Sequence, residues 1–369
     1  MKISVLQQDL LPVIQAVSRS IGVRSQLPVL DNILLSADGA KLKLSATNLE
    51  IGVIKYISVE VLVPGEITVP AKTLVEIISG LGPTKIELES EGEVLTVRSG
   101  KFKATINGIA AAEFPAIPAS EGEGTDFDKS ALLTSHQILF AAAVDEGRPV
   151  LTGILTQKSS EKLDFVATDG FRLAHRQVKL DSGSKPFESL IPRRTFEEVI
   201  RIISEEDLSE DEKINLSTSK GQNQIIFTIG QTIVSSRLIE GQFPSWEKII
   251  PTEIKTRATV EKEQLLKALK LAAVFAKNEA NVITLTSEEG KLGLKSQAKE
   301  LGGQENEIDS QIEGEPIQIA FNSKFLQDAI SACPSTQIMI EFSGPLSACL
   351  IKPIGVEGLE YIVMPVRLS

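Results

Sequence analysis

The stretch VATDGFRLAHR, residues 166–176, holds the side chains of this chain that are best suited to acid, base or anion chemistry. It places Asp169, Arg172, His175 and Arg176 around a glycine turn, and the whole chain has only two histidines. A carboxylate, an imidazole and a guanidinium held together could serve as general acid, general base and anion clamp. One hypothesis for the chain is therefore a hydrolase that uses Asp169, His175 and Arg172.

The same stretch is also typical of a β-hairpin. Asp-Gly is a common hairpin corner, and β-branched and aromatic residues flank it on both sides, as in paired strands. In this interpretation Asp169 and Gly170 make the corner. Arg172, His175 and Arg176 then face solvent or a partner molecule.

The sequence patterns of common catalytic and metal sites are missing. His136 lies in a helical stretch beside apolar residues, where a packed or partly exposed histidine is expected. No G-x-S-x-G, H-E-x-x-H, C-x-x-C or G-x-G-x-x-G pattern occurs, and Leu292 stands where a phosphate-binding loop needs a hydroxyl residue. With 49 Asp and Glu residues, any single carboxylate pair carries little information. We therefore predict no catalytic centre, no metal site and no cofactor.

Composition predicts an intracellular globular protein with several domains. At 369 residues the chain exceeds one ordinary core, and its apolar segments are too short and charge-interrupted to span a membrane. The N-terminus lacks a secretory pattern, and two cysteines, Cys333 and Cys349, exclude a disulfide framework. The net charge of −11 argues against nucleic-acid binding unless one concave face is basic.

The chain repeats one plan three times. Segments at 67–81, 189–203 and 317–333 each run from a short strand-like stretch into a helix with apolar residues at i, i+3, i+4 and i+7. These stripes are Leu74, Ile77, Ile78 and Leu81, then Phe196, Val199, Ile200 and Ile203, then Leu326, Ala329, Ile330 and Cys333.

A second helical pattern precedes each of these, over 10–21, 130–143 and 265–272, and the middle one is the least regular. Alternating, β-branched stretches between and after the helices predict antiparallel strands, and the absence of a βαβ rhythm indicates α+β domains. Polar, turn-rich linkers at 118–126 and 251–256 place the domains at residues 1–122, 123–253 and 254–369.

The six helical segments together carry a small positive charge in this acidic chain. If they share one surface, that surface is basic, as expected for sequence-independent contact with phosphates. Solvated helix faces would explain the same charges without any nucleic acid.

Six motifs follow one another through the chain: LPVLDNILL (27–35), TVPAKTLVEI (68–77), FVATDGFRLAHR (165–176), LIPRRTFEEV (190–199), EGQFPSWEKIIP (240–251) and YIVMPVRL (361–368). Together with the threefold repeat, they resemble the bacterial sliding clamps, the beta subunits of DNA polymerase III. The resemblance implies an α+β fold of three DNA-clamp domains, each with two helices packed on antiparallel sheets. It also implies a homodimer that closes head to tail as a six-domain ring around duplex DNA.

The implied function is that of a non-catalytic processivity factor in the bacterial cytoplasm, at the nucleoid. An ATP-dependent clamp loader would load the ring, and a peptide pocket would tether the polymerase catalytic subunit, the clamp loader, and repair and translesion polymerases. Carried onto this sequence, the pocket residues are Leu151, Thr168, Gly170, Phe171, Arg172, Leu173, Pro244, Lys248, Ile249, Asn322, Phe325, Leu346, Ala348, Ile362, Met364, Pro365, Val366, Arg367 and Leu368.

Within this implied pocket, Arg172 or Arg367 would bind backbone carbonyls or an acidic residue of the guest. Phe171 and Val366 depart from the family, in which a histidine and a methionine are familiar at these positions. Both departures keep the pocket apolar. Ser369 extends the usual terminal Arg-Leu by one residue.

The resemblance assigns two further surfaces. Its duplex DNA contacts correspond to Arg24 and Lys72, with Arg148 in the matching loop. Its ring interface corresponds to a strand around Ile106 and a helix end at Val274 and Phe275.

Three hypotheses make different predictions. A hydrolase loses turnover when His175 is replaced by alanine, whereas in a clamp this change is nearly silent and removal of residues 364–369 abolishes polymerase stimulation. A three-domain adhesion or scaffold protein has no DNA partner. Retention on circular but not on linearised DNA separates the clamp from the other two, because only a topological link depends on free ends.

Overall fold

The structure is a computed structural model, which describes residues 1–22, 27–118, 120, 124–180, 186–219, 223–277 and 280–367. The chain forms two compact units, one of residues 1–133 with 197–238 and one of residues 134–196 with 239–369. Neither unit coincides with one sequence repeat, because strands of neighbouring repeats pair with each other. Among the described residues, no helix is long and apolar enough to cross a membrane.

The strands of the first unit are β1 (Lys2–Leu6), β2 (Asn32–Asp38), β3 (Lys41–Thr47), β4 (Ile51–Ser58), β5 (Glu60–Val63), β6 (Gly65–Pro70), β7 (Lys85–Glu91), β8 (Val94–Ser99), β9 (Phe102–Asn107), β10 (Thr125–Asp128), β15 (Lys213–Ser219), β16 (Gln224–Ile229) and β17 (Thr232–Arg237). In the described part of the chain they form two sheets, ordered β5-β1-β7-β8-β9 and β10-β15-β16-β17-β4-β3-β2-β6. The helices are α1 (Gln7–Ser18), α2 (Ala71–Gly80) and α3 (Lys129–Leu133), with 3-10 turns η1 (Pro28–Asp31) and η2 (Ala111–Glu113). Most of α4 (Arg193–Glu205) also belongs to this unit.

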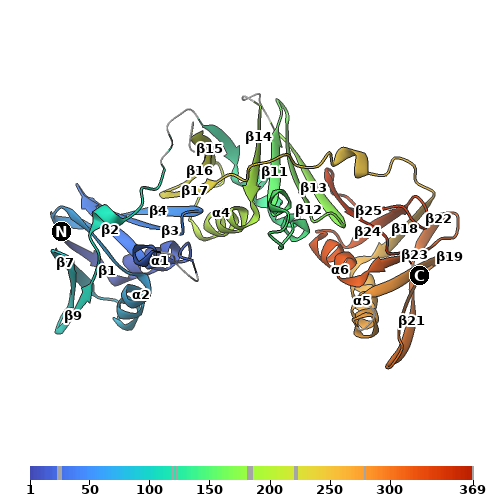
Figure 1. Ribbon diagram of the computed structural model, residues 1–369, viewed down its shortest axis with the longest axis horizontal. Helices are drawn as coiled ribbons and strands as arrows, with labels where there is room; N and C mark the ends of the chain where they lie inside the picture. The colour runs from blue at the N-terminus through green and yellow to red at the C-terminus, as the bar shows by residue number, and fades with distance from the viewer. Residues whose placement is uncertain are drawn as a thin grey trace. The chain divides into compact units, whose positions relative to one another are not determined.

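The strands of the second unit are β11 (Gly153–Lys158), β12 (Lys162–Thr168), β13 (Arg172–Lys179), β14 (Phe187–Pro192), β18 (Thr256–Glu261), β19 (Val282–Glu288), β20 (Lys291–Ala298), β21 (Gly302–Asp309), β22 (Gln311–Gly314), β23 (Gln318–Asn322), β24 (Gln337–Phe342), β25 (Cys349–Pro353) and β26 (Leu359–Val363). Among the residues described, their sheets are ordered β14-β11-β12-β13-β26-β25-β24-β18-β22 and β21-β20-β19-β23. Helices α5 (Lys262–Ala276) and α6 (Ser323–Ala332) lie side by side (Figure 1), and 3-10 turns occur at η3 (Thr134–Gln137), η4 (Leu139–Ala141), η5 (Pro149–Leu151) and η6 (Glu247–Ile249).

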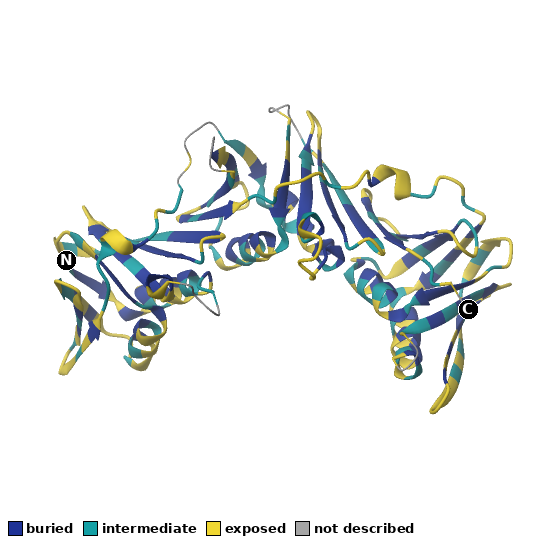
Figure 2. Cartoon of the chain, viewed as in Figure 1, coloured by how far each residue is buried: buried dark blue, intermediate teal, exposed yellow. Residues whose placement is uncertain are grey.

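Apolar residues at helix and strand spacing form the buried core, as α1 and β3 of the first unit illustrate. On β3, Leu42 and Leu44 alternate with polar residues and are fully buried, and they face the side of the sheet on which α1 lies. Helix α1 buries Leu10, Ile14 and Val17 at helical spacing. Each such side chain contributes about 1.5–3 kcal/mol relative to exposure. Figure 2 shows the result, with buried residues on one face of the helices and exposed residues on the other.

Two large sheets are each assembled from half-sheets of consecutive repeats. In the first unit β4 pairs with β17, and in the second unit β13 pairs with β26 in the same antiparallel manner. Every paired strand of the described chain is antiparallel, as the absence of a βαβ rhythm predicted.

The prediction of a continuous helix over 130–143 is wrong. Only α3 is α-helical there, and the chain continues through the 3-10 turns η3 and η4. Thr134 and Ser135 follow α3, and their hydroxyl groups compete for backbone hydrogen bonds, which weakens a helix. His136 is exposed within η3. On α4 the buried stripe includes Ile202, while Ile200 is only half-buried.

Candidate functional site

The Asp-Gly pair makes a tight hairpin corner between β12 and β13, as predicted. Thr168 Oγ1 donates to the carbonyl of Arg172 at 2.6 Å and accepts from the amide of Gly170 at 3.0 Å. Asp169 Oδ1 accepts from the amides of Phe171 and Arg172 at 2.9 and 3.0 Å. Gly170 has φ of +90°, a conformation that glycine adopts without strain. The side chains of Thr168 and Asp169 therefore stabilise the corner, and Phe171 beside it is exposed.

Arg172 does not face solvent, contrary to the expectation from the hairpin pattern. Its Nε donates to Asp169 Oδ2 at 3.0 Å, Nη1 to Asp328 Oδ2 at 2.6 Å and Nη2 to the carbonyl of Phe140 at 2.8 Å. The guanidinium also lies over the rings of Phe140 and Phe325, 5.2 and 4.8 Å from their centroids. Three of the five N–H groups of the guanidinium are thus bonded within the second unit, and Arg172 supports the corner.

His175 is likewise buried, with only 7% of its surface exposed. Its Nε2 lies 2.7 Å from Asp164 Oδ1, and its Nδ1 lies 3.0 Å from Glu360 Oε1. Burial alone would lower the pKa of His175, but hydrogen bonds and charge from the two carboxylates outweigh burial and raise it. The ring cross-links β12, β13 and β26 and packs on Trp246 with ring centroids 4.4 Å apart.

Arg176 completes this buried set and is also not freely solvated. Its Nη1 donates to the carbonyl of Glu357 at 2.7 Å, and partial burial lowers its pKa. A hydrolytic centre needs a base that substrate can reach, whereas His175 is buried between Asp164 and Glu360 and makes no contact with Asp169 or Arg172, both of which the structure describes. Among the described residues, no three His, Cys, Asp or Glu side chains gather as a metal site requires.

A cluster of exposed apolar side chains lies around the corner instead. Phe171, Leu346, Met364 and Ile249 are 58, 64, 40 and 37% exposed, although each is large and apolar. Next to the corner, Leu173 belongs to a buried cluster with Leu155, Val166, Leu190, Trp246, Ala348, Leu350 and Ile362. Exposed apolar groups that share one neighbourhood indicate a binding surface for another molecule.

Several direct contacts join the residues that the resemblance places in the partner pocket. The amide of Met364 donates to the carbonyl of Phe171 at 2.9 Å, and the rings of Phe171 and Phe325 stack with centroids 6.2 Å apart. Leu173 pairs with Ile362 across β13 and β26. Chain segments that are far apart in sequence thus meet at one corner of the second unit.

Other pocket candidates have more specific positions. Asn322 Oδ1 accepts from the amide of Lys324 and caps α6, and the amide of Val366 donates to the carbonyl of Ala320. Leu151 is buried at the end of η5. Pro244 and Lys248 are exposed beside Trp246, Arg367 is exposed and Pro365 is half-buried. Leu368 lies outside the described residues, as does Ser369.

The candidate DNA and ring contacts are placed as follows. Lys72 is exposed on α2, whereas Arg24 lies outside the described residues. Arg148 Nη2 donates to the carbonyl of Asp169 at 2.7 Å, so this guanidinium lies at the hairpin corner. Val274 is 59% exposed on α5 and Phe275 is half-buried.

Ile106 does not fit a side-chain contact with another subunit. Its side chain points into the core of the first unit and is 4% exposed. The strand that carries it, β9, is nevertheless the edge of its sheet in the described structure, so its backbone can still pair with another strand.

Sequence reasoning missed the groups that hold the corner in place. Asp328 and Phe140 bind Arg172, and Asp164 and Glu360 bind His175. The sequence gives little indication of these four residues, because each has a common residue type and lies far from its partner in the chain. Only Trp246 was conspicuous, as the single tryptophan of the chain.

Comparison with known proteins agrees with this architecture. Residues 1–118, 130–245 and 247–367 match the models of the N-terminal, central and C-terminal domains of the DNA polymerase III beta subunit. The chain is 34% identical to the beta sliding clamp of Synechocystis sp. and 28% identical to that of Bacillus subtilis, over all of each chain.

Solved structures show the same similarity. The crystal structure of the DNA polymerase III subunit beta from Pseudomonas aeruginosa matches with a TM-score of 0.94 and 28% identity over all of both chains. The DNA polymerase sliding clamp from Bacillus subtilis matches with a TM-score of 0.94 and 26% identity over the same extent. These matches cover the whole sequence and all three repeats, and the chain belongs to the family of the DNA polymerase III beta subunit, the beta sliding clamps.

Proposed function

We propose that this chain is a homodimeric, ring-shaped processivity factor that encircles duplex DNA and has no catalytic centre of its own. The observation that carries the proposal is the incomplete pairing of its half-sheets. Within the two units, β4 joins β17 and β13 joins β26. At both junctions an edge strand of one repeat pairs with an edge strand of the next repeat. If the third repeat follows this pattern, its β21 pairs with β9 of a second copy of the chain.

Both of these strands are sheet edges in the described structure. Exposed edges invite pairing with another chain, and a head-to-tail contact between two copies would pair both edges at once. The pairing would use the backbone of β9, so the buried side chain of Ile106 does not oppose it. Exposed Val274 on α5 supports an apolar contribution to the same contact. A closed ring then holds DNA by topology, without base recognition.

The exposed apolar corner of the second unit is the proposed tether for partners. Phe171, Met364 and Leu346 would hold apolar side chains of a short peptide from the polymerase catalytic subunit, the clamp loader, or repair and translesion polymerases. Arg367 or Arg172 is the proposed cation of this site, and Arg148 remains a proposed DNA contact. Lys72, together with Arg24, is proposed to contact DNA phosphates, where weak and sequence-independent attraction permits sliding.

The repeats support domains at residues 1–122, 123–253 and 254–369, which we propose as the units of the ring. An ATP-dependent clamp loader is the proposed source of opening, and the bacterial cytoplasm at the nucleoid is the proposed site of action.

The test separates encirclement from tethering. The double variant Phe171→Ala, Met364→Ala removes two exposed side chains, so folding and DNA retention should persist. After loading by a clamp loader, the wild-type protein and the variant should both stay on nicked circular DNA and leave it on linearisation. Polymerase processivity should fall at least about tenfold in the variant only, since two central apolar contacts of the tether are lost.

The matched control is Leu62→Ala, which truncates a similarly exposed side chain on β5. This variant should retain both the retention on circular DNA and the stimulation of polymerase processivity. Retention that survives linearisation would contradict encirclement, and full processivity of the double variant would contradict the assigned tether.

A further inference from the structure

The first unit contains a second copy of the hairpin corner that holds the proposed tether. Between β3 and β4, Thr47 Oγ1 donates to the carbonyl of Ile51 at 2.9 Å and accepts from the amide of Leu49 at 3.0 Å. Asn48 Oδ1 accepts from the amides of Glu50 and Ile51. Each of these hydrogen bonds has its counterpart at Thr168 and Asp169, and Leu49 repeats the positive φ of Gly170.

The strand junction beside this corner is repeated as well. The amide of Arg237 donates to the carbonyl of Glu50 at 3.0 Å, just as the amide of Met364 donates to that of Phe171. Ser235 pairs with Gly52, as Ile362 pairs with Leu173. The register therefore makes Gly52, Ser235 and Arg237 the counterparts of Leu173, Ile362 and Met364.

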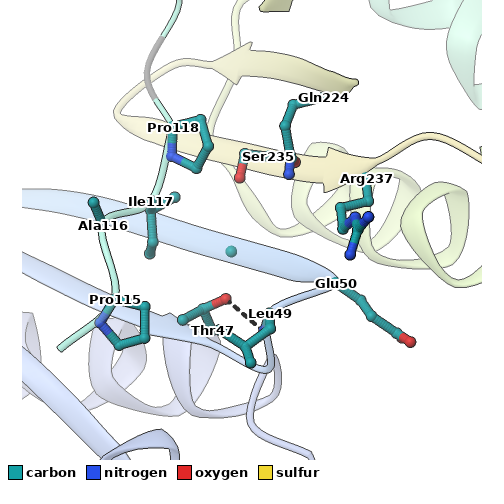
Figure 3. A pocket seen from close by; sticks show the side chains of 11 residues that line it. Thr47, Leu49, Glu50, Pro115, Ala116, Ile117, Pro118, Gln224, Ser235 and Arg237 are labelled. Carbon is teal, nitrogen blue, oxygen red and sulfur yellow. Dashed lines mark hydrogen bonds between the residues drawn. The ribbon is translucent and has the colours of Figure 1, made fainter. Parts of the chain in front are cut away.

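A cavity of about 440 Å³ lies at this second corner. Figure 3 shows its two sides, with the corner at Thr47 and Leu49 and the segment from Pro115 to Pro118 on one side, and Gln224, Ser235 and Arg237 on the other. A volume of this order is within the range of small-ligand sites. Gly52 and Ser235 stand where the tether site has two large apolar side chains, and the Ile117 side chain lies so close to Gly52 that an added Cβ would be 2.7 Å from it.

The lining is polar where the tether site is apolar. Ser235 is 3% exposed, its Oγ faces the cavity, and no described group forms a hydrogen bond with it (Figure 3). The side chain of Arg237 is exposed at the rim and, among the described residues, has no acidic partner, while the Glu50 side chain extends away from the cavity. Leu49 and Ile117 keep part of the wall apolar. A hydroxyl that borders the cavity and a guanidinium without an acidic partner among the described residues are both suited to bind an oxygen-rich ligand.

We propose that this cavity is a second peptide site, which binds a short extended segment carrying a carboxylate next to an apolar side chain. Arg237 binds the carboxylate, Ser235 and Gln224 hydrogen-bond the peptide backbone, and Leu49 with Ile117 contacts the apolar side chain. The choice of a peptide rests on the proposed function of the tether site, whose corner and strand junction this site repeats. Its selectivity differs, because a cation stands where the tether site has Met364.

The test uses the full-length protein with ¹³C-labelled isoleucine δ1 methyl groups, observed by NMR. Ile117 reports on this cavity and Ile362 on the tether site. The probes are acetyl-Leu-Asp-amide and acetyl-Asp-Leu-amide, with the two asparagine analogues as matched controls. We expect a saturable shift of the Ile117 methyl signal with one aspartate probe, and binding at least about tenfold weaker with its asparagine analogue.

Two exposed positions provide matched variants. Arg237→Met installs the counterpart residue of the tether site and should weaken the Ile117 response at least about tenfold, whereas Arg237→Lys should retain part of it. Met364→Ala should leave the Ile117 response unchanged.

The proposal is overturned by an absent Ile117 response, by equal binding of the asparagine probe, or by a response that Arg237→Met does not alter. A response at Ile362 alone would also overturn it. If the Ile117 signal responds in a protein that fails the processivity test, the second peptide site is supported and only the proposed tether site is contradicted.

Discussion

At the scale of single residues, the groups that look catalytic in the sequence serve as internal cross-links. His175 joins two carboxylates from neighbouring strands, and Arg172 joins Asp169 and Asp328. Buried ionic groups are costly to leave unpaired, so each depends on its partners. The clamp hypothesis predicted a nearly silent His175→Ala change, whereas these contacts lead us to expect a loss of stability even without a catalytic role.

We predict that His175→Ala lowers the free energy of unfolding by about 3 kcal/mol near neutral pH, because the partly buried Asp164 and Glu360 both lose their hydrogen bond to the imidazole. The measurement is chemical denaturation of both proteins across pH. The control is His136→Ala, which changes an exposed histidine and should shift stability by less than about 0.5 kcal/mol.

The pH dependence of this loss has a definite sign. The raised pKa of His175 means that its contribution is full below the ordinary histidine pKa of about 6.5 and is lost as pH rises through the folded value. For Asp164, burial would raise the pKa, but hydrogen bonds from His175 and Gln177 outweigh it and lower the pKa. Its contribution is therefore lost as pH falls through its own lowered value. The difference in the free energy of unfolding between the wild type and His175→Ala should be largest between the lowered pKa of Asp164 and the ordinary histidine pKa of about 6.5. A difference that increases toward alkaline pH would contradict the proposed role of His175.

At the scale of elements, one corner design is used at two strand junctions with different residues. Thr168 with Asp169 and Thr47 with Asn48 make equivalent hydrogen bonds, so the two corners provide natural controls for each other. Only Asp169 has a second oxygen bound to an arginine, Arg172.

We predict that Asp169→Ala destabilises the chain by about 2 kcal/mol and also weakens partner-peptide binding, because Phe171 loses the corner that positions it. Isothermal titration with a polymerase-derived peptide and denaturation measure the two effects. Asn48→Ala should also destabilise the chain, through the equivalent corner, and leave binding of that peptide unchanged. Equal loss of binding in both variants would show that the effect is general unfolding and not a local change at Phe171.

At the scale of the whole molecule, the half-sheets account for the need for a second copy. Four half-sheets pair within the chain and two, which end at β9 and β21, keep an open edge in the described structure. A protein that leaves such edges unpaired risks aggregation, whereas a specific dimer uses them.

We predict that Val274→Asp converts the dimer into a folded monomer, because it places a charge in the proposed apolar contact while the side chain is exposed in the single chain. Sedimentation equilibrium should give the mass of one chain. Val144→Asp alters an even more exposed valine outside the proposed contact and should stay dimeric. A Val274→Asp protein that remains a dimer would exclude this residue from the interface.

The α+β class, the threefold repeat and five of the six helical segments were predictable from the sequence. Local patterns carry this information, since Leu10, Ile14 and Val17 follow helical spacing and Leu42 and Leu44 follow strand spacing. The hairpin at Asp169-Gly170 was also predictable, because a turn depends on adjacent residues. The broken helix after α3 was not, since tertiary packing around the buried Ser135 overrides a weak helical pattern.

Only the tertiary structure decided what the charged residues of the hairpin do. Whether Arg172 and His175 face solvent depends on Asp328 and Glu360, which are more than 150 positions away in sequence. The same holds for the polar cavity in the first unit, because its corner and its Arg237 come from different repeats that meet only when β4 pairs with β17. Backbone pairing between distant strands brings these groups together, and no local pattern in the sequence encodes that pairing.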